Sequence, residues 1–166
     1  MAGISMIEAL VGMLLIALWL LSSAGLQVSS LKFQAGAASR YTAVALASEL
    51  GERMEANAVG AVGTAYVLAP TDAVVSAQAD CTAIACAPDL IASYDMAQWT
   101  ARVVDELKQL KSMSVVSSLS ATGQKTYTIS ISWDEPRGRQ TYASGGSATS
   151  ETMSYVTTKV LRDASL

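Results

Sequence analysis

Residues 3–21 read GISMIEALVGMLLIALWLL, and this stretch decides the fold. It opens a longer run, because no charged residue occurs from Ala9 to Leu31. At 1.5 Å of rise per residue, a helix over this run is long enough to cross about 30 Å of hydrocarbon. The core helix of a soluble protein is an alternative, but such helices seldom run so far without a polar face. We therefore predict a transmembrane helix over residues 4–29.

A secretory signal peptide is the other alternative for an apolar run near the N-terminus. Such a peptide carries a basic region before the run and a cleavage site after it. Here the basic region is missing, and the small residues Ser22, Ser23 and Ala24 are followed by further sequence that favours a helix. The pattern favours a retained anchor.

The composition excludes several functional classes. The mean hydropathy of +0.35 is high for a soluble domain, which agrees with apolar residues gathered in one segment. Lys and Arg are scattered and the net charge is -3, so we expect no nucleic-acid partner. The chain has no His, which removes the usual general base and the commonest metal ligand. We expect neither an enzyme nor a bound cofactor or metal.

Glu8 stands directly before the apolar run. An isolated carboxylate at the edge of a hydrocarbon span costs several kcal/mol unless it finds a partner or becomes protonated. A functional role in assembly and a position in the lipid headgroup region both remain open from this residue alone.

The order Gly3-Ile4-Ser5-Met6-Ile7-Glu8 resembles the signature of the type IV prepilin family, in which Gly, an apolar residue and a Glu open an apolar helix. The resemblance implies that a prepilin peptidase cuts between Gly3 and Ile4 and methylates the new amino terminus of Ile4. It also gives Glu8 a role in filament assembly. Residues 1–3 would be the remnant of the leader. This leader is shorter than usual in the family and lacks the usual Lys or Arg, so the true translation start stays open. A second departure is Ile4, which stands where the family most often has Phe.

The helix is predicted to continue over residues 30–58, where Ala is frequent and an apolar face recurs at helical spacing. Glu49 and Arg53 are placed to form an ion pair on an exposed face. Gly60 and Gly63 are breakers after Asn57. The predicted apolar face consists of Ala43, Leu46, Ala47, Leu50 and Met54.

A loop is predicted over residues 59–79, with turns at Pro70 and Asp72 and a short strand over 66–68. Cys81 and Cys86 follow. Two cysteines in a chain without His cannot complete a tetrahedral zinc site, so a disulfide is the preferred interpretation. The predicted membrane helix would leave the C-terminal domain on the oxidising periplasmic side, where a disulfide persists.

The remaining sequence predicts a helix followed by strands. Helical spacing extends from Pro88 to Lys111, on a face formed by Leu90, Tyr94, Ala97, Ala101 and Val104 and broadened by Trp99, Val103, Leu107 and Leu110. Alternating apolar residues predict an antiparallel hairpin, with Met113, Val115 and Leu119 in one strand and Tyr127, Ile129, Ile131 and Trp133 in the other. Thr122 and Gly123 mark its turn. A long loop over 134–150 and a last strand over 152–161 complete an α+β, pilin-like fold: a long N-terminal helix packed on a small antiparallel sheet, with a second helix. Residues 59–166 would form a periplasmic globular domain.

Several later pieces together resemble the PilV family, the type IV pilus modification proteins. They are residues 52–57, the pair Asp80-Cys81 with Cys86, residues 94–99 and residues 131–133. The resemblance implies a minor pilin that joins other minor pilins, the major pilin and a tip adhesin, in the inner membrane and at the pilus tip. It implies roles in priming pilus assembly, twitching motility and adhesion. A type II secretion pseudopilin, a tethered periplasmic enzyme and a simple anchor are the alternatives.

Overall fold

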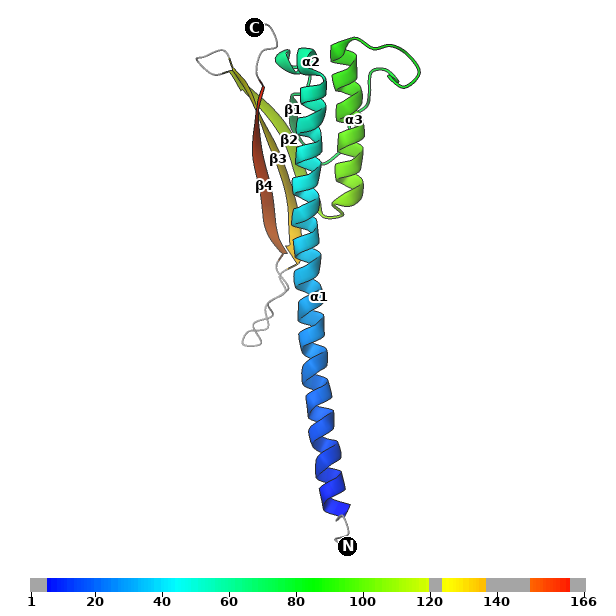
Figure 1. Ribbon diagram of the computed structural model, residues 1–166, viewed down its shortest axis with the longest axis vertical. Helices are drawn as coiled ribbons and strands as arrows, with labels where there is room; N and C mark the ends of the chain where they lie inside the picture. The colour runs from blue at the N-terminus through cyan, green and yellow to red at the C-terminus, as the bar shows by residue number, and fades with distance from the viewer. Residues whose placement is uncertain (1–5, 120–123, 137–149, 162–166) are drawn as a thin grey trace. The chain divides into compact units, whose positions relative to one another are not determined.

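The computed structural model describes residues 6–119, 124–136 and 150–161. The described chain forms a long helix, two shorter helices and one four-stranded antiparallel sheet of order β1-β2-β3-β4 (Figure 1). This arrangement confirms the predicted α+β, pilin-like fold class. The elements are α1 (Met6–Ala56), α2 (Ala58–Val62), β1 (Leu68–Thr71), α3 (Pro88–Glu106), β2 (Leu110–Leu119), β3 (Lys125–Pro136) and β4 (Ser150–Leu161).

The chain divides into two compact units, Met1–Ala37 and Ala38–Leu166, and α1 contributes to both. In the first unit no described residue is buried. In the second unit, the C-terminal part of α1 buries one face. Its buried residues are Ala43, Leu46, Ala47, Leu50, Gly51 and Met54, which confirms the predicted apolar face.

The core of the second unit joins α1, α3 and the inner face of the sheet. The predicted hairpin is confirmed: β2 and β3 pair antiparallel, with Val115 opposite Ile129. Leu119 lies in β2 as predicted but is 73% exposed, so the buried alternation of Met113 and Val115 does not extend to it. The predicted turn at residues 122–123 and residues 137–149 of the predicted loop lie outside the described residues. The described ends of that loop were predicted wrongly, because residues 134–136 belong to β3 and residue 150 begins β4. The buried strand residues are Met113, Val115, Tyr127, Ile129, Ile131, Trp133 and Leu161.

Helix α3 ends at Glu106 rather than at Lys111. Leu107 leaves helical geometry at φ -104° and ψ 84°, and Leu110 already pairs with Trp133 in the sheet. The predicted apolar face was right in part: Trp99, Val103 and Leu107 are buried, but Ala101 is exposed and Ala97 is only half-buried. The buried face of α3 contains its largest side chain, Trp99. It consists of Ala92, Met96, Trp99, Thr100 and Val103.

The segment after α1 differs from the prediction. Asn57 ends α1 but also caps α2, since its side chain accepts a hydrogen bond from Gly60 N. Gly60 therefore lies within a helix rather than breaking one. A Cβ atom there would lie 2.5 Å from the Pro88 carbonyl oxygen, so only Gly fits.

The first strand also lies later than predicted. It covers Leu68–Thr71, whereas Tyr66 is fully buried in the core. Pro70, predicted as a turn residue, stands in this strand. Since β1 is an edge strand, a residue without an N–H group is tolerated there.

Candidate functional site: the N-terminal helix and the clamp between α1 and α3

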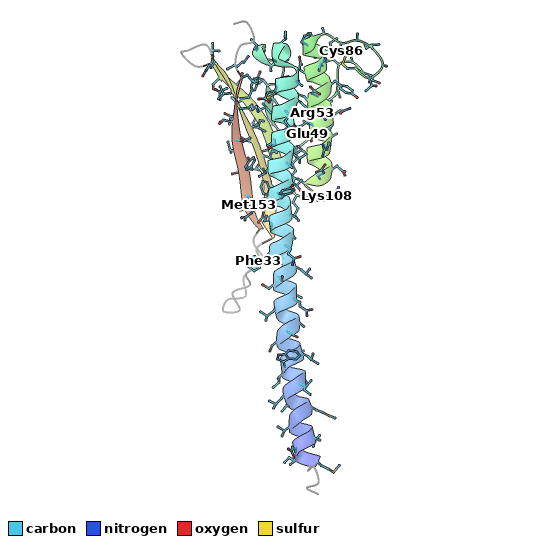
Figure 2. All side chains as sticks on the ribbon, in the orientation of Figure 1. Phe33, Glu49, Arg53, Cys86, Lys108 and Met153 are labelled. Carbon is cyan, nitrogen blue, oxygen red and sulfur yellow. A yellow bond between two sulfur atoms is a disulfide. The ribbon has the colours of Figure 1, made fainter. Side chains whose placement is uncertain are left out.

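The first unit presents a nearly continuous apolar surface. Side chains from Met6 to Phe33 project from the helix without any covering element (Figure 2). Its large exposed residues include Met6, Leu10, Met13, Leu15, Trp19, Leu21, Leu26 and Phe33, each at least 60% exposed. A helix of this length and apolarity can cross a membrane or pack against other apolar helices.

Two charged residues mark this part of the helix. Within residues 6–37 the sequence carries only Glu8 and Lys32. By helical rise they lie about 36 Å apart along the axis, slightly more than the thickness of the hydrocarbon layer. Glu8 is exposed in the first turn, where a carboxylate interacts favourably with the positive end of the helix dipole. Gly3 and Ile4, the predicted processing site, lie outside the described residues.

The polar and small residues of this segment are compatible with an apolar environment. Ser22 Oγ donates to Leu18 O at 3.0 Å, and Ser23 Oγ donates to Leu20 O at 2.9 Å, so neither hydroxyl needs water. A Cβ atom added at Gly12 or Gly25 would meet nothing within 4 Å. These glycines therefore make no close packing contact with the described part of this chain, although small residues do let a second helix approach closely.

An ionic network connects α1 to α3. Arg53 donates to Glu49 Oε1 from Nη2 at 2.8 Å and to Asp95 Oδ1 from Nη1 at 3.0 Å (Figure 2 labels Glu49 and Arg53). Burial lowers the pKa of Arg53, but the hydrogen bonds to the two carboxylates outweigh it and raise that pKa overall. Arg102 on α3 also pairs with Glu49. The Glu49–Arg53 pair is thus partly buried between helices, not on an exposed face as predicted.

The same network fixes the loop before β1. Tyr66 Oη donates to the second oxygen of Asp95, Oδ2, at 2.6 Å, and Asn57 Nδ2 donates to Tyr66 Oη at 3.2 Å and to Pro88 O at 2.7 Å. Burial, together with the bond to Asp95, raises the pKa of the Tyr66 hydroxyl. The hydroxyl therefore stays protonated and donates at physiological pH.

Trp99 is the last member of a group of residues that joins α1 to α3. We call this group, Glu49, Arg53, Asn57, Asp95 and Trp99, the clamp. Trp99 is fully buried, and its Nε1 donates to Leu46 O of α1 at 2.8 Å. Four of the residues that carried the family resemblance, Arg53, Asn57, Asp95 and Trp99, therefore share one structural task, which is to hold α1 against α3. Their spacing in sequence predicted helices but could not reveal that they meet.

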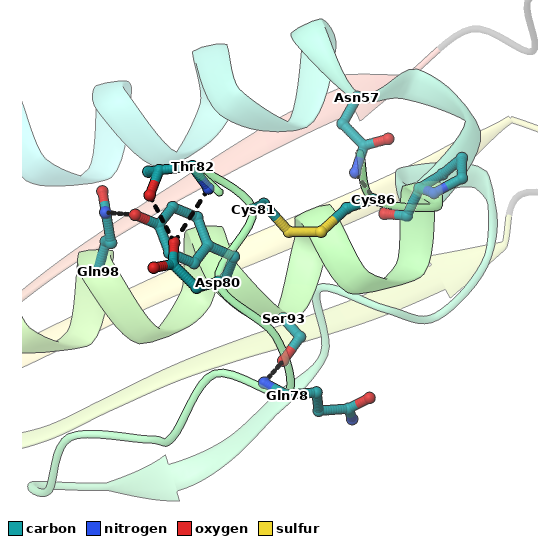
Figure 3. Close-up of a disulfide and its surroundings, with 10 residues drawn as sticks. Asn57, Gln78, Asp80, Cys81, Thr82, Cys86, Ser93 and Gln98 are labelled. Atoms are coloured by element: carbon teal, nitrogen blue, oxygen red, sulfur yellow. Dashed lines mark hydrogen bonds between the residues drawn. A yellow bond between two sulfur atoms is a disulfide. The ribbon is translucent and has the colours of Figure 1, made fainter. Parts of the chain in front are cut away.

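Cys81 and Cys86 form a disulfide in the loop before α3 (Figure 3). Asp80 Oδ1 accepts hydrogen bonds from Thr82 Oγ1 and N, and these bonds lower the pKa of Asp80. Gln78 N donates to Ser93 Oγ at 3.0 Å, which ties the loop to α3. Within the described ranges, no group of three or more His, Cys, Asp or Glu side chains could hold a metal ion.

The disulfide should contribute modestly to stability. Closing so short a loop removes little entropy from the unfolded chain, so replacing both Cys81 and Cys86 by Ser should lower the free energy of unfolding by about 2 kcal/mol. Urea unfolding of the oxidised protein and of the double variant measures this difference. Dithiothreitol should destabilise the parent protein and leave the double variant unchanged; equal effects on both would contradict the assignment.

Part of the chain matches a family of known proteins. Residues 25–97 match the Tt1218-like family model, described as type IV pilin Tt1218. No curated protein and no solved structure matches. The matched region contains most of the clamp and the disulfide, together with the part of α1 that follows Ala24. The match supports a type IV pilin, and it does not single out the PilV family among the pilins.

Proposed function

We propose that this chain is a minor type IV pilin that helps prime pilus assembly within a minor-pilin complex at the filament tip. In this role it supports pilus biogenesis, twitching motility and adhesion. The observation that carries the proposal is the apolar, uncovered helix of residues 6–37, which opens with one carboxylate and continues into a folded unit. The family match over residues 25–97 supports the same class.

The physical reason is that such a helix suits two environments. As a membrane anchor it buries its apolar side chains in lipid, with the folded unit in the periplasm. In a filament, the same side chains pack against helices of other pilins. Prepilin peptidase would prepare the chain by cleaving after Gly3 and methylating Ile4.

A minor rather than a major subunit is favoured by the position of the disulfide. Cys81 and Cys86 precede the sheet, whereas major pilins usually carry their cysteine pair in a late, C-terminal loop. The expected partners are other minor pilins, the major pilin and a tip adhesin.

Deletion of the gene tests the proposal. We expect surface pili and twitching to fall strongly while the major pilin remains at normal level in the inner membrane, because a primer limits initiation rather than supply. Electron microscopy, a twitching assay and immunoblotting of membranes measure these quantities, with a complemented strain as control. Normal piliation with loss of protein secretion would instead identify a type II secretion pseudopilin.

A further inference from the structure

We propose that the Cys81–Cys86 disulfide is a redox-sensitive switch. When a protein dithiol reduces it, residues 79–91 are released from α2 while the core stays closed. The disulfide lies outside the core: residues 76–91 are all described, and none of them belongs to the core cluster or packs against it. Opening this segment therefore leaves the buried contacts of α1, α3 and the sheet in place. The inference concerns the second unit and does not depend on the proposed function.

The loop closed by the disulfide has few other constraints (Figure 3). Residues 82–85 are all exposed. The hydrogen bonds that Asp80 accepts come from Thr82 and Ala83, which belong to the loop itself. Among the described residues, no hydrogen bond joins residues 79–87 to an element other than α3. The disulfide is therefore the principal constraint on the shape of this loop.

The disulfide also restrains the first turn of α3. Cys86 directly precedes Ala87, the N-cap residue of α3, whose side chain makes no capping hydrogen bond. A helix start without such a cap is less stable by about 1 kcal/mol and frays more readily. Because the bond to Cys81 holds Cys86 in place, fraying of this turn is limited in the oxidised protein. Reduction removes that restraint.

The first turn of α3 in turn contacts the start of α2. Pro88 O accepts a hydrogen bond from Asn57 Nδ2 at 2.7 Å, and a Cβ atom at Gly60 would lie 2.5 Å from the same oxygen. Movement of Pro88 therefore breaks the bond to Asn57 and opens space beside Gly60. The other end of α2 stays in place, because Tyr127 Oη of β3 donates to the buried Ala61 O at 2.7 Å.

The chemical step is thiol–disulfide exchange. A thiolate of the dithiol attacks one sulfur of the disulfide; the S–S bond breaks, a mixed disulfide forms, and the other cysteine leaves as a thiolate that takes a proton from water. The second thiol of the dithiol loses its proton, attacks the mixed disulfide and releases the remaining cysteine. Two electrons pass to this chain, and the reductant becomes a disulfide. Both Cys81 and Cys86 are partly exposed, which gives the dithiol access.

Hydrogen exchange of the full-length protein in detergent tests the inference, with reduced thioredoxin as the dithiol. We expect thioredoxin to reduce the folded protein without denaturant. Reduction should speed exchange of the amides of Gly60 and Ile91 by about tenfold and leave Ile129 and Ile131 of β3 unchanged, because local opening does not require global unfolding. The double variant Cys81→Ser and Cys86→Ser should exchange like the reduced parent, and thioredoxin should not alter it.

A second arm measures the coupling between the disulfide and α2. Gly60→Ala forces Pro88 away from α2 in the oxidised protein, so reduction should then speed exchange at Ile91 by less than about threefold. Gly51→Ala is the matched control. Its Cβ would meet only the Lys159 side chain at 3.6 Å, an ordinary contact, so reduction should still give the tenfold change. If Gly60→Ala does not fold, the comparison of oxidised and reduced parent stands by itself.

Four outcomes would overturn the inference. They are reduction by thioredoxin only in urea, loss of protection throughout β3, unchanged exchange at Gly60 and Ile91 after reduction, and equal effects of reduction in the Gly60→Ala and Gly51→Ala variants. None of these outcomes bears on the role in pilus assembly, which gene deletion tests separately.

Discussion

Glu8→Ala should leave the chain in the membrane and abolish its contribution to piliation. As a membrane anchor, the helix would hold Glu8 near the interface, so its removal should not harm insertion. In a filament, the helices leave lipid and water for a packed, low-dielectric bundle. There the carboxylate can compensate the amino terminus of its own or a neighbouring subunit, and a charge left alone is costly.

The measurement is complementation of a deletion strain. Pili are counted by electron microscopy, and the variant is quantified in membranes. Mass spectrometry should show cleavage after Gly3 and a methylated Ile4 in both parent and variant, so that a processing defect is excluded. Lys32→Ala removes the other charge of the segment and should restore pili normally. Full piliation with Glu8→Ala would show that the carboxylate is only a tolerated interfacial residue.

Trp99→Ala should lower the free energy of unfolding by about 3–5 kcal/mol, the usual range for deleting a buried Trp. Trp99 has no exposed surface and belongs to the cluster that joins α1, α3 and the sheet. Its removal leaves a cavity between the two helices and also deletes the hydrogen bond to Leu46 O. A loss of this size is a large fraction of the stability of a small domain.

Chemical unfolding of the detergent-solubilised protein, followed by near-UV circular dichroism, measures this effect. Trp99→Phe keeps a six-membered aromatic ring but loses the indole N–H donor. It should therefore lower the free energy of unfolding by an intermediate amount. Gln98→Ala changes the exposed neighbour and should alter stability by less than about 0.5 kcal/mol. A small effect of Trp99→Ala would mean that the α1–α3 contact does not support the core.

The parts of the fold that follow from regular spacing could be predicted. The buried face of α1 and the alternation of Tyr127, Ile129 and Ile131 gave correct inward faces, because a single period decides which side each residue takes. The end of α3 could not be predicted in this way. Residues 107–111 continue a helical apolar pattern, and pairing of Leu110 with Trp133 in the sheet overrides it.

The candidate site likewise has one part that could be predicted from the sequence and one part that could not. The apolar helix with Glu8 is a local pattern and is visible in the sequence. The clamp is not, since Arg53 and Asp95 are separated by 42 residues and their contact depends on how α1 meets α3. The same holds for the order of the strands, because sheet order is a property of the assembled strands.

The composition of the core has a consequence for the order of events during synthesis. Leu46 and Leu50 of α1 share one core with Trp99 of α3 and with Leu161 of β4. During synthesis α3 can therefore cover part of the apolar face of α1 first, but the core stays incomplete until β4 has been made and has joined the sheet. The interval before β4 joins is when the domain is most exposed to proteolysis and misassembly.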